Sequence, residues 1–390
     1  MPIRRWRFAF REGPLCLMFF KMLYRDMVVT GVEERKLREG VRCALLVVAI
    51  TLGRGACAQV SDASAGLINR DAIVFSRAAE KVYAVDQGRG AVSVVSRGGG
   101  VKSVKVGAGP EAIAVNERTG MVYVANSGGR SVSVIDGKSD AVVATVATAA
   151  RPYAIAVDEV GNKVYVSNTF SNMLTVIDGE TNVASAVKTG SADALVVDGG
   201  RHRVYLMGYE SDALTVLDME SGAITKMPAG AMHLWGIAPM GKTLYVTHVQ
   251  DASVAAIDVE TQAMVKIATG AMPCAVAVDS ARGEVYVANY AAGSVTVIDG
   301  RREAVVATVM VGAHPQAIAV DAVHGFVYVA NKQGNSVSVI DARAHRVVKT
   351  LRAAGHPYAI AVDADSHQVY VANLDGSPFT VFEGSTQAGR

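Results

Sequence analysis

A unit of 40 to 42 residues recurs along this chain, and this repeat constrains the fold more than any other feature of the sequence. Each unit holds four short runs with strand character, which we call a, b, c and d in chain order. In the seventh unit they cover residues 317–320, 327–330, 336–340 and 347–351. The marker of run b is a tyrosine, at Tyr83, Tyr123, Tyr165, Tyr205, Tyr245, Tyr286, Tyr328 and Tyr370.

The four runs differ in how they place apolar residues. Runs a and b are apolar at nearly every position, which indicates strands with both faces buried. Run c alternates Ser or Thr with Val, so we expect one of its faces to tolerate water. In run a the small Ala side chains share one face, which suits the narrow end of a wedge-shaped blade.

Polar residues end three of the runs. Asp ends runs a and c in several units, where its side chain can close an Asx-turn on the backbone that follows. Asn ends run b, and we expect the same turn there. All of these residues have a structural task, and we do not expect them to be catalytic. They are Asp158, Asp279, Asp321 and Asp363 after run a, Asp136, Asp178, Asp299 and Asp341 after run c, and Asn126, Asn168, Asn289, Asn331 and Asn373 after run b.

Repetition of four-stranded sheets at this period predicts an all-β fold, a single β-propeller. A straight stack would leave two open ends, and neither terminus looks like a capping unit. The chain has eight runs of types a, b and c but seven d runs, because the last unit stops after residues 379–382. We therefore predict eight blades, with a strand from residues 59–70 completing the last one. The alternative is a seven-bladed ring with a loose partial unit.

The amino-acid sequences of these runs resemble those of a known family. Residues 122–126 read Val-Tyr-Val-Ala-Asn and residues 131–136 read Ser-Val-Ser-Val-Ile-Asp, and residues 285–289 and 294–299 repeat them almost unchanged. This pattern is similar to the YVTN family of β-propeller repeats over residues 70–384. The resemblance implies the propeller fold, for which members of that family commonly resemble seven-bladed rings, and says almost nothing about function.

Residues 1–58 differ from the rest of the chain in charge. They hold 11 Lys and Arg against 5 Asp and Glu, a net charge of +6, whereas the remainder holds 27 against 31, a net charge of −4. Four basic residues within 35–42, ten apolar residues 43–52 and Ala-Cys-Ala at 56–58 are typical of a signal peptide cleaved before Gln59. The apolar run is too short to span a bilayer. We therefore expect an exported protein, periplasmic or extracellular, with a propeller domain over residues 59–390. A buried N-terminal helix is the alternative.

The leader has further consequences. Residues 1–26 fit no part of a signal peptide, so we expect translation to begin downstream, with Met27 as the candidate start. Cleavage removes Cys16, Cys43 and Cys57, which leaves Cys274 alone and allows no intramolecular disulfide. The net negative body is a poor match for nucleic acid, whose phosphates need clustered cations.

Candidate binding positions lie where the repeat varies. Propeller ligands usually meet the d-to-a and b-to-c connections over the central channel, which is an expectation from the fold alone. Two positions of the d-to-a connection change from unit to unit although the strands around them do not. Three residues before run a stand Asn69, Gly109, Arg151, Ser191, His233, Met272, His314 and His356. One residue before run a stand Asp71, Glu111, Tyr153, Asp193, Trp235, Cys274, Gln316 and Tyr358.

The last four units place metal-binding side chains in the first of these rings. They are His233, Met272, His314 and His356, with Cys274 beside them. Imidazole, thioether and thiolate groups are ligands for copper or zinc. The alternative is that each histidine only hydrogen-bonds within its own turn.

The opposite arc offers oxygen atoms. Asp71, Glu111 and Asp193 stand at the second ring position, with Asn69 at the first. Carboxylates in such a cluster suit calcium, or a general acid and base in a lactone-opening enzyme. The alternative is a solvated polar rim.

Units four and five depart most from the repeat. Met207 with Gly208, and His248, replace the usual end of run b, and Pro239 removes a ladder donor from run a. Trp235 is the one Trp outside the leader. A loop Trp is a common anchor for a partner or ligand, and a packed loop aromatic is the alternative.

Several catalytic and cofactor motifs are missing: Cys-x-x-Cys-His, Gly-x-Ser-x-Gly and a Walker-type phosphate loop. We therefore predict a non-enzymatic binding or scaffold propeller that presents its loops to a protein, glycan or small molecule, without nucleic acid as a partner. No cofactor is expected, with a metal ion as the exception. The alternative is a periplasmic lactonase-like or metal/redox enzyme with its site at the channel mouth. The candidate ligand-binding residues are Arg151, Tyr153, His233, Trp235, His248, Tyr358, Asp71, Glu111 and Asp193.

Overall fold

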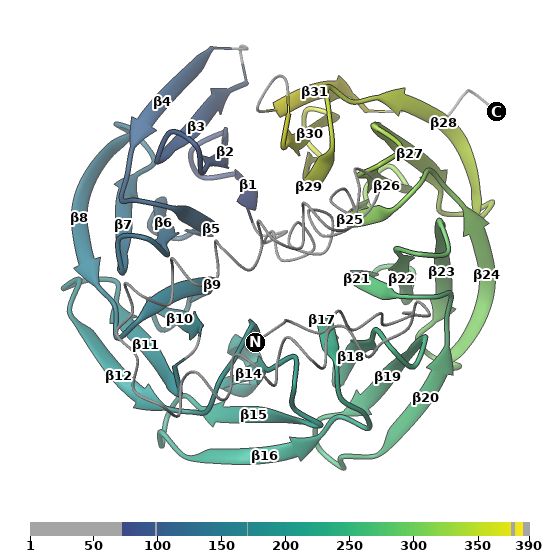
Figure 1. Cartoon of the computed structure of the whole chain (residues 1–390), viewed down its shortest axis with the longest axis horizontal. Helices are drawn as coiled ribbons and strands as arrows, with labels where there is room; N and C mark the ends of the chain where they lie inside the picture. Colours follow the sequence, from purple (N-terminus) through teal and green to yellow (C-terminus); the bar gives the residue numbers. More distant parts are fainter. Residues whose placement is uncertain (1–71, 98–99, 170, 376–378, 385–390) are drawn as a thin grey trace, which may run out of the picture. The chain divides into compact units, whose positions relative to one another are not determined.

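The computed structural model describes residues 72–97, 100–169, 171–375 and 379–384. The chain divides into two units, Met1–Leu67 and Ile68–Arg390, and every described residue belongs to the second. Eight antiparallel sheets surround a common centre in that unit (Figure 1). The predicted all-β, eight-bladed propeller is therefore confirmed, and the seven-bladed alternative is wrong.

Each blade is a meander in which neighbouring strands in the chain pair with one another. Blades 1 to 4 comprise β1 (Ile73–Ser76), β2 (Lys81–Asp86), β3 (Ala91–Ser96) and β4 (Val101–Lys105); β5 (Pro110–Asn116), β6 (Met121–Asn126), β7 (Ser131–Asp136) and β8 (Ala141–Ala147); β9 (Arg151–Asp158), β10 (Lys163–Thr169), β11 (Met173–Asp178) and β12 (Ala184–Lys188); and β13 (Ala194–Asp198), β14 (Arg203–Met207), β15 (Ala213–Asp218) and β16 (Ile224–Pro228). Blades 5 to 8 comprise β17 (Leu234–Met240), β18 (Thr243–His248), β19 (Ser253–Asp258) and β20 (Met264–Ala268); β21 (Pro273–Asp279), β22 (Glu284–Asn289), β23 (Ser294–Asp299) and β24 (Ala304–Met310); β25 (Pro315–Asp321), β26 (Phe326–Asn331), β27 (Ser336–Asp341) and β28 (Arg346–Arg352); and β29 (Pro357–Asp363), β30 (Gln368–Asn373) and β31 (Phe379–Glu383).

The hydrophobic core is divided among the interfaces between blades. Between blades 2 and 3, for example, Tyr123 packs in one cluster with Val164 and Ile177. The eight repeated tyrosines are all buried in this way. The hydroxyl of Tyr83 donates to the carbonyl of Gly137 in the next blade at 3.2 Å. The tyrosine marks the repeat because it fills, and in places also hydrogen-bonds across, the seam between two blades.

The c strands are drier than their alternating pattern predicts. Ser133 and Thr296 are each 1% exposed, so the expected water-tolerant face of run c is wrong. The reason is a polar contact inside the blade: the amide nitrogen of Asn126 donates to Ser131 at 3.3 Å and to Ser133 at 3.0 Å. A buried hydroxyl is acceptable once it has a hydrogen-bond partner.

The same contact corrects the role that we expected for the Asn residues. Their amide nitrogens bind Ser or Thr of strand c, and the Oδ1 atoms of Asn126, Asn168, Asn289 and Asn331 accept no hydrogen bond from any described residue. An Asx-turn after run b is therefore wrong for these four. The Asx-turns after runs a and c are confirmed, as where Oδ1 of Asp158 accepts from the amide of Val160 at 3.1 Å.

The ring closes between blades 8 and 1. The guanidinium of Arg97, after β3, lies 3.0 Å from the carboxylate of Asp363, at the end of β29, and Asp363 has no exposed side-chain surface. Blade 8 has three described strands, and the strand that we predict from residues 59–70 lies outside the described residues, as does the whole leader. No helix in the described part of the chain is long and apolar enough to cross a membrane.

Candidate functional site

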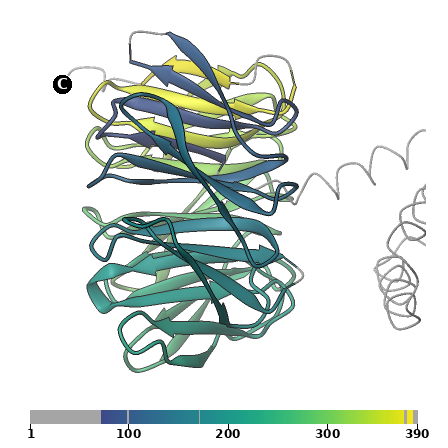
Figure 2. The ribbon, with the colours of Figure 1, turned by 90° about the vertical axis from the view of Figure 1, so that its left-hand side faces the viewer.

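The strands run between the two faces of the ring (Figure 2), and the connections therefore fall into two sets. The b-to-c and d-to-a connections meet on one face, which we call the rim face. The a-to-b and c-to-d turns meet on the other, which we call the turn face. Strands β1, β5, β9, β13, β17, β21, β25 and β29 stand nearest the centre (Figure 1). The variable positions found in the sequence, as far as the structure describes them, lie on the rim face.

The ring position that holds the histidines has a left-handed backbone in five blades, whereas Arg151 and Ser191 at the same position do not have a positive φ. The φ angles are +60° at Gly109 and His233, +55° at Met272, +54° at His314 and +42° at His356. In this conformation the carbonyl of His314, for example, accepts from the amide of Lys332 at 2.9 Å. Gly and His accept positive φ more readily than most residues. Histidine at this position therefore suits a demand of the backbone, whatever its side chain does.

The side chains of these histidines each make a separate contact. His233 meets the ring of Tyr209 edge-on, with centroids 5.1 Å apart, and His314 stacks on Tyr290 at 4.3 Å. His356 lies 2.5 Å from the carboxylate of Asp375. Groups of His, Cys, Asp and Glu close enough to share an ion do not include these residues in the part of the chain that the structure describes. The predicted ligands His233, Met272, His314 and His356 are not brought together.

Aromatic side chains line the rim over blades 4 to 6. Tyr209 follows β14, Trp235 lies in β17 and Tyr290 follows β22. The rings of Tyr209 and Trp235 meet edge to face, with centroids 5.6 Å apart. Trp235 and Tyr290 both pack against the buried pair of Cys274 and Ala288. We call Tyr209, Trp235 and Tyr290 the aromatic arc; all three are half-buried.

Hydrogen-bonding side chains line the rim over blades 1 to 3. The carboxylate of Glu111 accepts from Gln87 at 2.8 Å and from Ser127 at 3.3 Å, and Arg151 reaches Ser127 at 3.5 Å. Burial raises the pKa of Glu111, and the Ser127 hydrogen bond and the charge of Arg151 oppose that rise. We call Gln87, Glu111, Ser127 and Arg151 the polar arc.

The remaining predicted residues have mixed positions. Tyr358 is 6% exposed, and burial, together with the charges of nearby carboxylates, raises its pKa to about 12. Tyr153 is half-buried in β9. Asp193 is also half-buried and accepts from the amide of Tyr209 at 2.8 Å. Asp71 lies outside the described residues.

His248 is buried inside its blade and is not accessible on the rim face. It has no exposed surface, and its ring nitrogens lie 3.2 Å from Ser253 and 2.8 Å from the carbonyl of Ala229. It stands where other blades have Asn, and Ser253 matches the Ser that those Asn residues bind. Burial lowers the pKa of His248. Both of its ring nitrogens contact groups inside the protein, so His248 has a structural role, and we do not include it in the candidate site.

Both connections were expected on the rim, but the two variable positions predicted from the sequence come from the d-to-a connection, and the residues of the b-to-c connection were missed. Gln87, Ser127, Tyr209 and Tyr290 all follow run b directly, or one residue later in blade 4. A signal for them existed, because this position also varies from unit to unit: it reads Gln, Ser, Thr, Tyr, Val, Tyr, Lys and Leu along the chain. The b-to-c loops therefore carry half of the candidate site.

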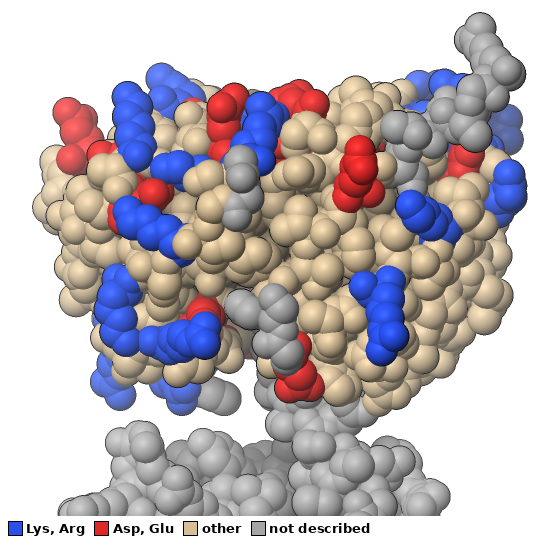
Figure 3. Space-filling view, turned by 90° about the horizontal axis from the view of Figure 1, so that it is seen from above, with Lys and Arg blue, Asp and Glu red and all other residues tan. Residues whose placement is uncertain are grey.

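The surface of the ring carries both signs of charge. On the side that Figure 3 shows, Lys and Arg are interspersed with Asp and Glu, and most of the wall between the two faces is uncharged. An interspersed surface of this kind does not concentrate a field of one sign.

Comparison with known proteins supports the fold. A family model described as YNCE-like beta-propeller matches residues 204–387. No curated protein matches the chain. Among solved structures, Kuenenia stuttgartiensis hydrazine synthase is similar with a TM-score of 0.56 at 17% identity, over 82% of this chain and 97% of that one.

Two further structures show the same likeness. Dihydro-heme d1 dehydrogenase NirN in complex with DHE has a TM-score of 0.67 at 17% identity, over 79% of this chain and 72% of that one. The computationally designed Ika8 protein has a TM-score of 0.66 at 13% identity, over 81% and 97%. Because two are enzymes and one is a design, the likeness establishes a β-propeller and leaves function to the site.

Proposed function

We propose that this protein is an exported binding propeller of the YVTN repeat type, and that its ligand occupies the rim face between the aromatic arc and the polar arc. The leader with its signal-peptide pattern supports export. The repeated sequence pattern in β6, β7, β22 and β23 supports the assignment to the YVTN repeat type.

One observation carries the binding proposal: the rim combines two contiguous arcs of unlike chemistry on a scaffold of near-identical blades. Aromatic side chains bind the apolar part of a ligand and contribute most when they anchor an interface. Amide, carboxylate, hydroxyl and guanidinium groups fix the orientation of its polar part. A glycan, a peptide segment of a protein or a small amphipathic molecule offers both kinds of surface.

The enzymatic alternative lacks such an observation. Glu111 already accepts two hydrogen bonds, and Asp193 accepts one from the backbone of Tyr209. The predicted metal ligands lie in separate contacts. We therefore propose no catalytic residues on the rim.

Trp235 supplies the reporter for a test. The other Trp of the chain, Trp6, lies in the predicted leader, so the fluorescence of the mature protein would report on the aromatic arc alone. Arrays of oligosaccharides and of short peptides supply the probes, and each hit is titrated by Trp235 fluorescence.

The variants separate the two arcs. Tyr209→Ala and Arg151→Ala should each weaken a true rim ligand by about tenfold or more, which corresponds to about 1.4 kcal/mol. His202→Ala, on the turn face, should leave affinity unchanged. A ligand that binds both rim variants as tightly as the unaltered protein would place the site elsewhere.

A further inference from the structure

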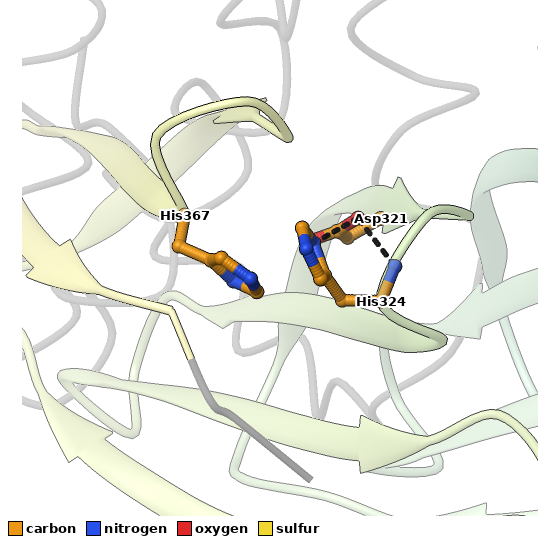
Figure 4. Close-up of side chains that lie close together, drawn as sticks. All are labelled: Asp321, His324 and His367. Atoms are coloured by element: carbon orange, nitrogen blue, oxygen red, sulfur yellow. Dashed lines mark hydrogen bonds and ion pairs between the residues drawn. The ribbon is translucent and has the colours of Figure 1, made fainter.

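The turn face carries a cluster that the rim does not use. Asp321 ends β25, His324 lies in the following turn, and His367 lies in the matching turn of blade 8. One potential ligand atom from each lies within 4.8 Å of those of the other two, and Figure 4 shows the two imidazoles facing each other across the seam between the blades. We propose that Asp321, His324 and His367 bind a divalent transition metal of the Zn²⁺ class.

The carboxylate of Asp321 is buried, and a buried carboxylate is stabilised by a cation beside it. Its side chain has no exposed surface, and Nδ1 of His324 lies 2.9 Å from it. In blade 6 the equivalent Asp279 is paired with Arg282 at 3.1 Å, and in blade 4 Asp198 is paired with Arg201 at 3.1 Å. Blade 7 has His324 where those blades have a permanently charged arginine. A metal ion at this place supplies the missing positive charge.

The imidazole of His367 supplies a second, independent indication. Its centroid lies 3.2 Å from that of His324, and its Nδ1 is buried without a hydrogen-bond partner among the described residues. A buried nitrogen without a partner is unfavourable, and a metal ion would bind it. The backbone at position 367 has a left-handed φ of +58°, for which glycine would serve equally well, as Gly325 does at +76° in blade 7.

The donor set defines the class of ion. Two imidazoles and one carboxylate, completed by water as a fourth ligand, suit Zn²⁺, Co²⁺, Ni²⁺ or Cu²⁺ better than Ca²⁺ or Mg²⁺. Bonds of about 2.0–2.2 Å to one tetrahedral ion place its ligand atoms roughly 3.3–3.6 Å apart. The atoms here lie within 4.8 Å of one another, so binding would require side-chain rotations in the two turns. The ion would join blade 7 to blade 8. The site lies on the face opposite the rim and does not depend on the proposed function.

The repeat itself supplies a matched variant that removes the site. His324→Arg combined with His367→Gly reproduces the seam of blades 6 and 7, where Arg282 pairs with Asp279 and its guanidinium lies over Gly325. This double variant should fold, which its circular dichroism and its melting temperature without metal will show. Asp321→Asn is a second variant that keeps a side-chain acceptor for the turn but loses the charge.

The experiment uses untagged protein stripped with EDTA. ZnCl₂ titration by calorimetry should show one ion per chain, and Co²⁺ should give visible absorption of a four-coordinate site. Bound Zn²⁺ should also raise the melting temperature. The His324→Arg/His367→Gly variant should lose all three signals, and Asp321→Asn should bind at least about tenfold more weakly.

The control removes two of the histidines of the rim face. His314→Asn combined with His356→Asn should still bind one ion. The proposal is overturned if the unaltered protein binds no ion, if the His324→Arg/His367→Gly variant still binds one, or if binding is lost only in the rim-face control.

Discussion

At the scale of the residue, this protein shows how one side chain can stand in for another. His248 takes the place of the Asn that ends strand b in other blades, and it uses both ring nitrogens inside the blade. With a proton on Nε2 it donates to the carbonyl of Ala229 and accepts from Ser253. That arrangement is the neutral imidazole.

His248 therefore predicts a pH dependence of stability. Burial lowers its pKa in the folded state from the ordinary value of 6.5. Below pH 6.5 the unfolded chain binds the proton more readily, so the free energy of unfolding falls as the pH falls towards the folded pKa. His248→Asn, which restores the residue of the other blades, should lose this component. Melting temperatures between pH 7.5 and pH 5 should fall more steeply for the unaltered protein, and parallel curves would contradict the argument.

At the scale of the element, the end of strand b and the d-to-a connection fit closely together. The amide nitrogen of Asn331 donates to Ser336 at 3.2 Å and to Ser338 at 2.9 Å. Gly312 lies directly against this amide, so a Cβ there would stand 2.7 Å from its Cγ and Nδ2 atoms. Gly107 and Gly270 meet Asn126 and Asn289 in the same way. The glycine is required by the close approach of two connections.

Gly312→Ala should accordingly destabilise the protein by about 1–3 kcal/mol, the usual effect of overfilling a packed site. Gly100→Ala is the control, because a Cβ there meets nothing within 4 Å, and its stability should change by less than about 0.5 kcal/mol. Chemical denaturation of both variants measures the difference. Equal stability of the two would show that the Asn amide moves aside without loss.

At the scale of the whole molecule, stability depends on closing the ring. Arg97 of blade 1 joins Asp363 of blade 8. Burial acts to raise the pKa of Asp363, but hydrogen bonds from Ser366 and Arg97 outweigh it and hold that pKa below its ordinary value. The contact is thus made with a charged carboxylate in the folded protein.

Removal of this contact should lower the stability of the protein only at pH values at which Asp363 is ionised. A carboxyl whose folded pKa is lowered stabilises the protein above its unfolded pKa, and this contribution is lost as the pH falls through the folded pKa. Arg97→Ala should therefore lower the melting temperature by a few degrees at pH 7, with a difference that shrinks below about pH 4. Arg89→Ala, whose partner Asp86 is in the same turn, should leave the melting temperature unchanged. An Arg97→Ala effect of the same size at pH 7 and at pH 2 would rule out the ion pair as its cause.

The sequence by itself determined the architecture, because a repeat of 40 to 42 residues with four strand runs can bury all its apolar faces only against copies of itself. It also fixed the Asx-turns, since an Asp side chain and the backbone two residues on are local to each other. It predicted run c wrongly, because a buried Ser such as Ser133 or Ser338 has its hydrogen-bond partner, an Asn, on another strand. Tertiary structure alone decided which loop residues meet. Trp235 was predicted as a candidate without its neighbour Tyr209, and Asp321 was predicted only to close an Asx-turn. The cluster with His324 and His367 forms because the ring brings the turns of two neighbouring blades together. The distance between these side chains cannot be read from the number of residues that separates them in the chain.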